Sequence, residues 1–292
     1  LTGYAAHFEL PIQKGVEVTD AHHDGEMWYL KTNQGAFQSH LLIAATGIWN
    51  APVSPKLPGQ DGFNGTILHS CDYTRPQDFA GKRVLVVGAG NSGTEIACAV
   101  AELAEATGLA VGQRGILMVK YPKTVLGSRL TSRLLRGLPD HISGLLLRAI
   151  HHDFAELGLP LPQHNLRYAY PVVGFDIVEA VKRGKVTTHT SLARFEGDEV
   201  IFTNGERASY DTVIMATGYQ PTLGFLEDAL KDIYPEPVPT LIPSALNDYQ
   251  LAKVPNALFF GYDYPESEAW LHRLPEKSQR AAEVINELVN VS

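Results

Sequence analysis

The chain has 292 residues, of which 45% are apolar and 19% charged, and its formal net charge is −8. Its length fits about two domains of roughly 150 residues each, and its apolar content can fill two cores. The acidic balance argues against a nucleic-acid or anionic-membrane surface, and no apolar run approaches the roughly 18 to 20 residues of a transmembrane helix.

The chain contains an internal repeat: the strings Thr-Asn, Ile and Ala-Thr-Gly recur at one constant offset of 171 residues. The repeat predicts a hairpin followed by a hydrophobic strand at two places. Each copy predicts a turn, then a buried strand, then an Ala-Thr-Gly stop. The three parts are Thr32–Gly35, Leu41–Ala44 and Ala45–Gly47 in the first copy, and Thr203–Gly205, Thr212–Met215 and Ala216–Gly218 in the second. Such a long period excludes a solenoid and favours two copies of a dinucleotide-binding domain. Chance matching of short strings is the alternative.

Between the two copies, Phe63–Tyr73 reads F-N-G-T-I-L-H-S-C-D-Y and Arg83–Gly93 reads R-V-L-V-V-G-A-G-N-S-G. The run of Val and Leu predicts a parallel strand that is covered on both faces. Gly88 permits a tight turn, Gly90 lets the backbone approach a pyrophosphate, and Gly93 permits close helix packing. The helix that follows presents N–H groups to the phosphates. An ordinary strand-to-helix turn is the alternative.

This helix is expected to start near Asn91 and to continue through Thr94–Ala106. We predict the next strand of the unit over Gly115–Val119, ending at Lys120. An NAD site would place Asp or Glu at such a strand end, whereas a cation suits the 2′-phosphate of NADPH. We therefore assign Lys120 as the main phosphate contact and Arg114 as a helper. A solvated lysine at the end of a strand is the alternative.

The segment Ser128–His164 goes beyond what a dinucleotide fold needs. Arginines and leucines at helical spacing predict one amphipathic helix, and Ile142–Phe154 predicts a second. These helices either shape a substrate entrance or only pack onto the domain. Farther along, we predict a helix over Phe175–Lys182 and a strand over Lys185–Thr188.

The cysteines and histidines argue against two other kinds of site. Cys71 and Cys98 form no C-x-x-C pair, which disfavours a disulfide reductase. We expect both to be buried thiols in a reducing compartment, and with no secretory signal present we expect a cytoplasmic protein. The eleven histidines include adjacent pairs, whose side chains cannot converge on one ion, and no H-E-x-x-H occurs. We therefore predict no metal site.

Together these motifs resemble the class B flavoprotein monooxygenases. The residues that carry the resemblance are Phe63, Gly65, His69 and Tyr73, the turn Gly88–Gly93, and Ala216–Tyr219. The Tyr that ends the Phe63–Tyr73 fingerprint resembles flavin-containing monooxygenases, including the plant YUCCA type, more than Baeyer–Villiger enzymes, whose fingerprint ends in Trp.

The resemblance implies an α/β fold with two dinucleotide-binding, Rossmann-like domains. The NADPH domain, residues 52–218, would be inserted into an FAD domain formed by residues 1–51 and 219–292. Val254–Gly261 resembles the last strand of that FAD domain. Family members open with their own G-x-G-x-x-G for FAD, and the region from Leu1 resembles the middle of a flavin domain instead. We therefore expect an N-terminally incomplete FAD domain and a fragment.

The resemblance also implies the chemistry, in which NADPH reduces FAD and the reduced flavin inserts one oxygen of O2 into a small soft-nucleophile or carbonyl substrate. The protein contributes placement and a dry pocket. The implied catalytic residues are His69, which would couple movement of the NADPH domain to the flavin, and Tyr73. The implied cofactor-binding residues are Thr46, Gly47, Gly88, Gly90, Asn91, Ser92, Gly93, Lys120, Ala216, Thr217, Gly218, Tyr219 and Gly261. For His69, a satisfied core histidine is the alternative.

Three other interpretations remain open. The chain could be a flavin-free NADPH-binding module, or one subunit of a split flavoenzyme whose partner chain supplies the missing FAD motif. A homo-oligomer is also compatible with the sequence. A disulfide or ferredoxin reductase is disfavoured by the missing cysteine pair and by the Phe63–Tyr73 fingerprint. The sequence does not identify the oxygenated substrate.

Overall fold

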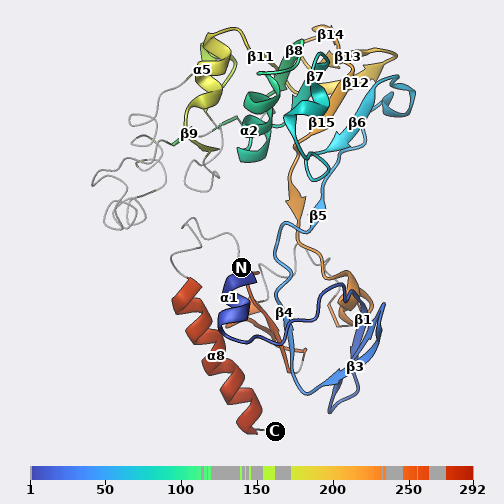
Figure 1. Cartoon of the computed structure of the whole chain (residues 1–292), viewed down its shortest axis with the longest axis vertical. Coiled ribbons are helices and arrows are strands. Elements are labelled where there is room, and N and C mark those ends of the chain that lie inside the picture. Colours follow the sequence, from blue (N-terminus) through green and yellow to red (C-terminus); the bar gives the residue numbers. More distant parts are fainter. Residues whose placement is uncertain are drawn as a thin grey trace. The chain divides into compact units, whose positions relative to one another are not determined.

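The computed structural model describes residues 2–112, 115–116, 118–119, 139, 142, 145, 154–161, 172–231, 233–234, 246–254, 256–262 and 274–291. The chain separates into two compact units (Figure 1). Unit 1 consists of Leu1–Ala51 and Gln220–Ser292, and unit 2 consists of Pro52–Tyr219. Unit 2 is therefore an insertion in the sequence of unit 1. Where the chain passes between the units, β5 (Ala51–Pro52) pairs with β16 (Tyr219–Gln220).

Unit 2 is built on a five-stranded parallel sheet with the strand order β11-β8-β7-β15-β6. The strands are β6 (Thr66–His69), β7 (Arg83–Val87), β8 (Ala106–Ala110), β11 (Thr187–His189) and β15 (Thr212–Met215). Val84, Leu85 and Val86 of the central strand are fully buried. This burial confirms the predicted strand with two covered faces, for which an unbroken apolar run is typical.

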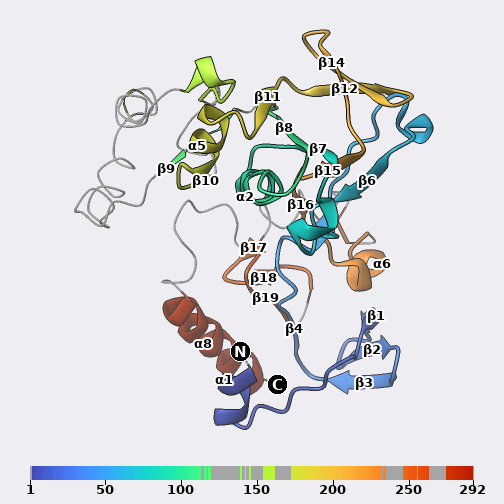
Figure 2. The same ribbon diagram turned by 45° about the horizontal axis from the view of Figure 1, so that its top comes forward.

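Different layers cover the two faces of this sheet (Figure 2). The helices α2 (Asn91–Val100) and α5 (Asp176–Lys182) pack in one apolar cluster with Val84 and Ile214. The antiparallel strands β12 (Leu192–Glu196), β13 (Glu199–Phe202) and β14 (Arg207–Ser209) pack in a second cluster with Leu85 and Val213. Neighbouring residues of one strand thus pack against opposite layers, because successive side chains of a strand point to opposite faces of the sheet.

An ion pair holds the start of β15 against β7. Arg83 Nη2 donates to Asp211 Oδ1 at 2.6 Å, and the Arg83 backbone N–H donates to Asp211 Oδ2 at 2.8 Å. The Asp211 N–H in turn donates to the Arg83 carbonyl at 2.8 Å. The hydrogen bonds from Arg83 lower the pKa of Asp211 to about 2. Side chain and backbone together therefore fix the register of the two strands that carry the predicted turn and the Ala-Thr-Gly stop.

Short elements complete the described part of unit 2. The strands β9 (Met118–Val119) and β10 (Val172–Val173) form a separate parallel pair. Single turns of 3₁₀ helix lie at Gln60–Gly62, Pro76–Phe79 and Ala155–Leu157.

The described part of unit 1 contains an antiparallel meander, a parallel pair and a small hairpin, together with four helical segments. The strands are β1 (Val18–His23), β2 (Trp28–Thr32), β3 (Gly35–Ser39), β4 (Leu42–Ala44), β17 (Leu246–Asn247), β18 (Gln250–Leu251) and β19 (Ala257–Phe259). The helices are α1 (Thr2–His7), α6 (Glu227–Lys231) and α8 (Leu274–Val291), with a 3₁₀ turn at Gly224–Leu226. The core of unit 1 gathers around the buried side chains of Trp28, Leu223, Phe259 and Tyr262.

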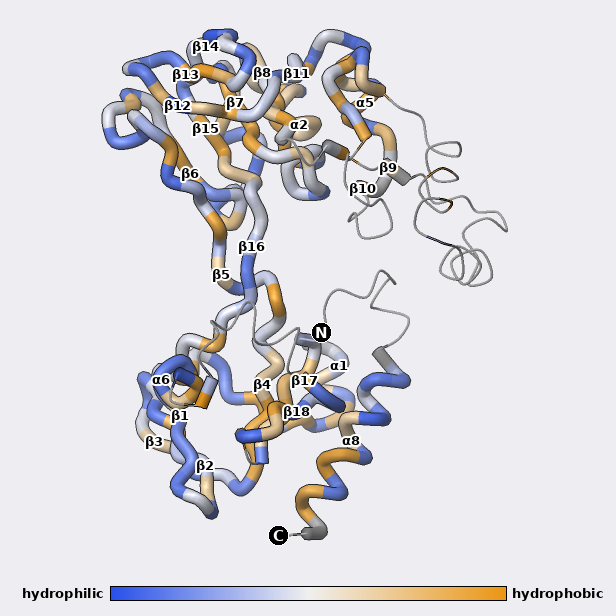
Figure 3. Tube along the Cα trace, turned by 180° about the vertical axis from the view of Figure 1, so that it is seen from behind, coloured by the Kyte–Doolittle hydropathy of each residue, from blue (hydrophilic) through white to orange (hydrophobic). Residues whose placement is uncertain are grey.

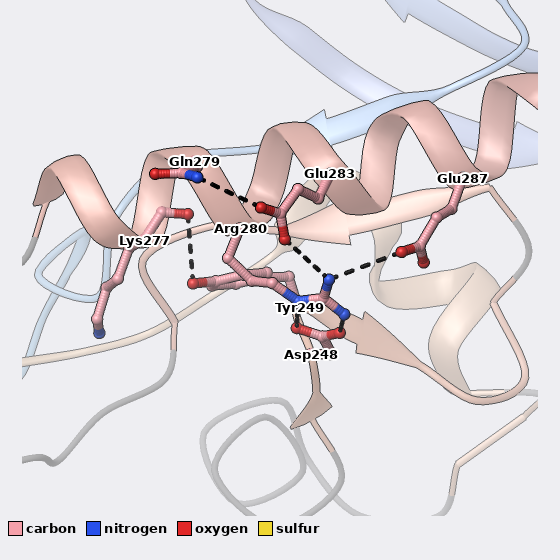
Figure 4. Close-up of polar contacts among 7 residues, drawn as sticks. All are labelled: Asp248, Tyr249, Lys277, Gln279, Arg280, Glu283 and Glu287. Atoms are coloured by element: carbon pink, nitrogen blue, oxygen red, sulfur yellow. Dashed lines mark hydrogen bonds and ion pairs between the residues drawn. The ribbon is translucent and has the colours of Figure 1, made fainter.

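The helix α8 is amphipathic, as the alternating colours along it show (Figure 3). Ala281 and Val284 pack on Tyr249 and Leu258. On the same helix, Arg280 reaches the turn between β17 and β18, where its Nε donates to Asp248 Oδ1 at 3.1 Å and its Nη2 also bonds that carboxylate (Figure 4). The helix therefore holds this turn through both apolar and charged contacts.

The two predicted repeats have the same order of elements in the structure. Each copy has a hairpin, β2–β3 or β13–β14, followed by a strand that ends at Ala-Thr-Gly, β4 or β15. The predicted turns Thr32–Gly35 and Thr203–Gly205 connect these hairpins. The prediction that both later strands are buried is confirmed for β15. In β4 it holds for Leu42 and Ala44 but is wrong for Ile43, which is 47% exposed whereas Ile214 of β15 is 0% exposed.

Two predictions about the segment after the glycine turn are wrong. The helix begins at Asn91 as expected but ends at Val100, and β8 begins at Ala106, where we expected the end of a helix. The second strand of the unit is therefore β8 and not Gly115–Val119. The composition of β8, Ala-Thr-Gly-Leu-Ala, lacks a β-branched run. A Cβ on Gly108 would lie 2.2 Å from the Tyr210 hydroxyl oxygen, so a glycine is needed here for the close approach of Tyr210.

The remaining predictions have mixed outcomes. The helix over Phe175–Lys182 is confirmed by α5, and the strand predicted at Lys185–Thr188 lies slightly later, as β11. Cys71 is exposed, so its predicted burial is wrong, whereas the half-buried Cys98 has its pKa raised to about 11 by burial. The two amphipathic helices expected within 128–164 rest largely on residues outside the described part. Across the described residues, no helix is both long and apolar enough to cross a bilayer.

Candidate functional site

The glycine turn Gly88–Gly93 lies between the carboxyl end of β7 and the start of α2. Gly88 has a φ of 111°, and a Cβ there would lie 2.4 Å from the Ala216 carbonyl oxygen. A Cβ on Gly93 would lie 1.9 Å from the Gly88 carbonyl oxygen. Both positions therefore require glycine for close packing, as the sequence predicts for a turn and for helix contact.

Gly90 differs from these two glycines because its surroundings are open. A Cβ on Gly90 would meet no atom within 4 Å, and the φ of −80° at this residue is accessible to other amino acids. Packing inside the protein therefore does not explain a glycine here. Gly90 is also the residue before α2, whose first N–H groups have no acceptor within the helix. The geometry fits a phosphate group that approaches the backbone at Gly90 and binds the helix N-terminus.

The Ala216–Gly218 stop lies beside this turn at the carboxyl edge of the sheet. The Ala216 N–H donates to the Val87 carbonyl at 2.8 Å, which joins the ends of β15 and β7. The chain leaves β7 toward β8 on one side and returns to β15 on the other, so the order of strands reverses here. In open α/β sheets, ligands bind at such a switch point, outside the carboxyl ends of the strands.

His69 ends β6 and lies next to the same stop. Its Nδ1 accepts a hydrogen bond from the Cys71 N–H at 3.2 Å, and its Nε2 lies 3.1 Å from the Gly218 carbonyl oxygen. The second contact requires a proton on Nε2, so this pattern assigns the neutral ring with its proton on Nε2. The ring also packs edge-on against Tyr219, with centroids 5.1 Å apart. The structure thus brings together His69, Gly218 and Tyr219, which the sequence predicted separately.

Tyr73 lies elsewhere in unit 2. Its ring stacks on Phe79 at a centroid distance of 5.7 Å, within the apolar cluster that also contains α2. Burial raises the pKa of its phenol. The described contacts of Tyr73 are therefore those of a packing residue, and its predicted catalytic role stays a prediction.

The position that would contact a ribose 2′-phosphate changes with the new strand order. Because β8 is the second strand, this position follows Ala110 rather than Val119. The first basic residue after Ala110 along the chain is Arg114, whereas Lys120 follows β9. Both Arg114 and Lys120 lie outside the described residues. The premise for choosing Lys120 over Arg114 is therefore wrong, although neither contact is tested.

In unit 1, the predicted residues Thr46, Gly47 and Gly261 follow the carboxyl ends of β4 and β19. The Thr46 hydroxyl bonds the hydroxyl of Tyr262, whose side chain is fully buried and whose phenol pKa is raised by burial. Gly47 and Gly261 have φ values of 78° and 83°, which favour glycine. These residues therefore share one edge of the β4–β19 pair.

Sequence reasoning missed an amide that ties two distant segments of unit 1. Asn50 Nδ2 donates to the Thr222 carbonyl at 2.9 Å, and the Thr222 N–H donates to Asn50 Oδ1 at 2.9 Å. A comparable tie in unit 2 joins the Thr217 hydroxyl to the Val53 carbonyl, while the Val53 N–H donates to the Gly218 carbonyl at 2.9 Å. Nothing in the local sequence distinguishes these partners, because they lie more than 160 residues apart.

Within the described ranges, no three His, Cys, Asp or Glu side chains gather in a group that could hold a metal ion. The described residues around Gly88–Gly93 are instead glycines, small polar side chains and backbone amides. Such a set can bind and orient a phosphorylated cofactor but supplies no general acid or base of its own.

Comparison with known proteins gives a family match over residues 22–252, to the model described as "FMO-like: Flavin-binding monooxygenase-like". The chain is 30% identical over 248 residues to the probable indole-3-pyruvate monooxygenase YUCCA8 of Arabidopsis thaliana. That match covers 77% of this chain and 58% of the relative. The chain thus spans less than two thirds of this relative's length.

Two solved structures resemble the whole fold. One is a mutant of the flavin monooxygenase from Stenotrophomonas maltophilia, with a TM-score of 0.69 and 21% identity, covering 98% of this chain and 75% of that one. The other is OTEMO in complex with FAD and NADP, with a TM-score of 0.66 and 18% identity, covering 88% of this chain and 64% of that one. At these identities the likeness shows the fold, an α/β architecture with two Rossmann-like domains.

Proposed function

The chain belongs to the flavin-binding monooxygenase-like family, and on this basis we propose that it forms the NADPH-binding part, and a portion of the FAD-binding part, of a flavin-dependent monooxygenase. Unit 2 is the NADPH domain and unit 1 the portion of the FAD domain. The open space at Gly90 carries the proposal, because it lies at the switch point of the sheet and at the start of α2.

In this proposal, the backbone of Gly88–Gly93 binds the pyrophosphate of NADPH. Asn91 and Ser92 contribute the first N–H groups of α2, and Ala216–Tyr219 border the cofactor on the side of β15. Arg114 or Lys120 binds the 2′-phosphate. His69, with its proton on Nε2, holds the Gly218 carbonyl and so positions Tyr219 at the edge of this site.

The proposal for the FAD site rests on three residues of unit 1. Thr46, Gly47 and Gly261 lie where a flavin nucleotide would meet the ends of β4 and β19. The described residues of unit 1, however, contain no strand, glycine turn and helix that could hold the FAD pyrophosphate. We therefore assign this chain no step of the flavin chemistry.

For the complete enzyme we propose transfer of one oxygen atom of O2 to a small soft-nucleophile or carbonyl substrate, with electrons from NADPH. The support is the family match and the name of the relative in Arabidopsis thaliana, an indole-3-pyruvate monooxygenase.

A second candidate is a flavin-free NADPH-binding module, or one subunit of a split flavoenzyme. It is favoured by the difference between the units, since the sheet of unit 2 has five strands and the parallel sheet described in unit 1 has two. An absorbance spectrum of the purified chain separates the candidates. Bound flavin excludes the flavin-free module, whereas a chain that stays colourless with added FAD and still binds NADPH supports it.

Gly90→Val tests the NADPH site directly. The new Cβ meets no protein atom within 4 Å, and the side chain enters the space proposed for the pyrophosphate, so we expect folding to be retained and NADPH affinity to fall. We expect a loss of at least roughly 100-fold, because hydrogen bonds to charged groups contribute about 1.5–3 kcal/mol each. Calorimetric titration with NADPH measures it. Gly62→Val is the matched control, since a Cβ there also meets nothing within 4 Å. Equal affinities for the two variants would contradict the proposal.

A further inference from the structure

The sequence contains two Asn-Gly pairs, and the asparagine of each is exposed in the structure. Asn64–Gly65 precedes β6, and Asn204–Gly205 lies in the turn between β13 and β14. An asparagine followed by glycine is prone to deamidation, because the next backbone nitrogen can attack the side-chain amide and glycine has no Cβ that would hinder the attack. Whether this nitrogen is available depends on the hydrogen bonds around each pair.

In the first pair, the backbone nitrogen is directed away from the sheet of unit 2. The Thr66 N–H donates to the Asp211 carbonyl at 3.0 Å, on the side of β15. Successive residues of an extended chain direct their N–H groups to opposite sides, so the Gly65 N–H faces the other side of β6. There β6 is the edge of its sheet, and among the described residues no group accepts a hydrogen bond from the Gly65 N–H.

In the second pair, the corresponding nitrogen is engaged. The Gly205 N–H donates to the Phe202 carbonyl at 2.9 Å. The side chain of Asn204 is also held, because its Oδ1 accepts from the Glu206 N–H at 3.1 Å. Attack of the Gly205 nitrogen on the Asn204 amide therefore requires the turn to open first. The two pairs share their sequence but differ in the protection of the attacking atom.

The Asn64 side chain lies beside a carboxylate. Its Nδ2 donates to Asp198 Oδ1 at 2.5 Å, and the Asn64 N–H donates to the Gly197 carbonyl at 3.4 Å. These two bonds join the start of β6 to the turn between β12 and β13. A carboxylate at position 64 would lose the Nδ2 donor and face the carboxylate of Asp198. The attraction between the two side chains would then become a repulsion between like charges.

We propose that Asn64 is a site of spontaneous deamidation, and that the product weakens the attachment of the β12–β13 turn to the start of β6. The Gly65 nitrogen gives its proton to a solvent base and bonds Cγ of Asn64, which closes a succinimide ring. The Cγ–Nδ2 bond breaks, and ammonia leaves with a proton from the solvent. Addition of water then opens the ring to an aspartyl or isoaspartyl residue. Water is the only co-reactant, no atom is oxidised or reduced, and the inference does not depend on the proposed NADPH site.

Incubation of the whole chain at mildly alkaline pH tests the modification. Mass spectrometry of its peptides measures the conversion of both asparagines, and a protein-isoaspartate methyltransferase with labelled S-adenosylmethionine measures the isoaspartyl product. We expect Asn64 to convert faster than Asn204 by on the order of 10-fold, because only the second pair is protected by its turn. Synthetic peptides of Phe63–Thr66 and Thr203–Glu206 lack this protection and convert at similar rates. Conversion of Asn64 at or below the rate of Asn204 in the folded chain overturns the proposal.

Two variants test the consequence of the modification. Asn64→Asp reproduces the aspartyl product, and we expect it to speed the hydrogen exchange of the backbone amide at position 64, which donates to Gly197 in the original chain. Adding Asp198→Asn removes the repulsion and slows this exchange again. Exchange that is the same in Asn64→Asp and the original chain overturns the proposed weakening, as does a double variant that exchanges as fast as Asn64→Asp.

Discussion

The strands β4 and β15 carry the same pattern and have different environments. Both end at Ala-Thr-Gly, and the glycines of these stops, Gly47 and Gly218, have similar φ values of 78° and 89°. Yet β15 lies inside a sheet of five strands, whereas β4 has one described neighbour. Backbone conformation at the stop is therefore encoded locally, while burial of the strand depends on which other segments pair with it.

The residues just before the two strands also differ. Asp211 bonds both the side chain and the backbone of Arg83 and so fixes β7 against β15. The equivalent position in the first copy is His40. The Arg83–Asp211 pair therefore holds the central strand of unit 2, and the first copy has a histidine in place of this aspartate.

The largest expected difference between the copies comes from shortening their equivalent isoleucines. Ile214→Ala removes a fully buried side chain and lowers the free energy of unfolding by about 3 kcal/mol. Ile43→Ala costs less than about 1 kcal/mol because half of this side chain is exposed. Urea unfolding, followed by circular dichroism, measures both. Equal costs would show that Ile43 is as well packed as Ile214 and would break the comparison.

The preference for NADPH over NADH tests the strand order within unit 2. Since β8 is the second strand, Arg114→Ala weakens NADPH binding by about 2 kcal/mol through the lost charge-assisted contact to the 2′-phosphate. NADH binding changes little, and Lys120→Ala is the control with a smaller effect. Titration of both variants with both nucleotides measures this. A larger loss in Lys120→Ala would restore the interpretation made from the sequence.

The smallest effect is the pH dependence of the Arg83–Asp211 pair. The pKa of Asp211 is lowered to about 2 by hydrogen bonds from Arg83, so the pair stabilises the folded chain above about pH 4 and this contribution is lost as the pH falls toward 2. Asp211→Asn therefore lowers stability at pH 6 more than at pH 3. The effect is modest because both side chains are partly exposed. Urea unfolding at both pH values measures the difference in midpoint between Asp211→Asn and the original chain. The same difference at pH 6 and pH 3 would exclude this linkage.

The sequence predicted the parts of the fold that depend on short-range signals. The apolar run before Gly88, the start of α2 at Asn91 and the hairpin turns at Gly35 and Gly205 all follow from local chemistry. It failed at β8, because Ala106–Ala110 has weak strand propensity and becomes a strand through its position beside β7.

The candidate site shows the same limit. Glycines at 88, 90 and 93 predicted a phosphate-binding turn. The steric contacts at Gly88 and Gly93 agree with the tight turn and the close helix packing that we assigned to them. The ties made by Asn50 and Thr217 could not be predicted, since their partners are backbone groups far along the chain. When a side chain bonds a backbone group, the partner can be any residue type, so the sequence does not mark the partner position.

The turn between β17 and β18 has a consequence for any shortened form of the chain. Asp248 and Tyr249 adopt φ values of 47° and 67°, an arrangement of a two-residue hairpin that Gly and Asn usually occupy. Arg280 holds the first residue, and the apolar side of α8 packs on the second. Deleting α8 would remove both restraints, and the Phe259 amide, which donates to the Tyr249 carbonyl at 2.7 Å, would lose its fixed acceptor. The C-terminal helix therefore maintains the geometry of a distant strand, and truncation there will loosen β19 before it affects anything in unit 2.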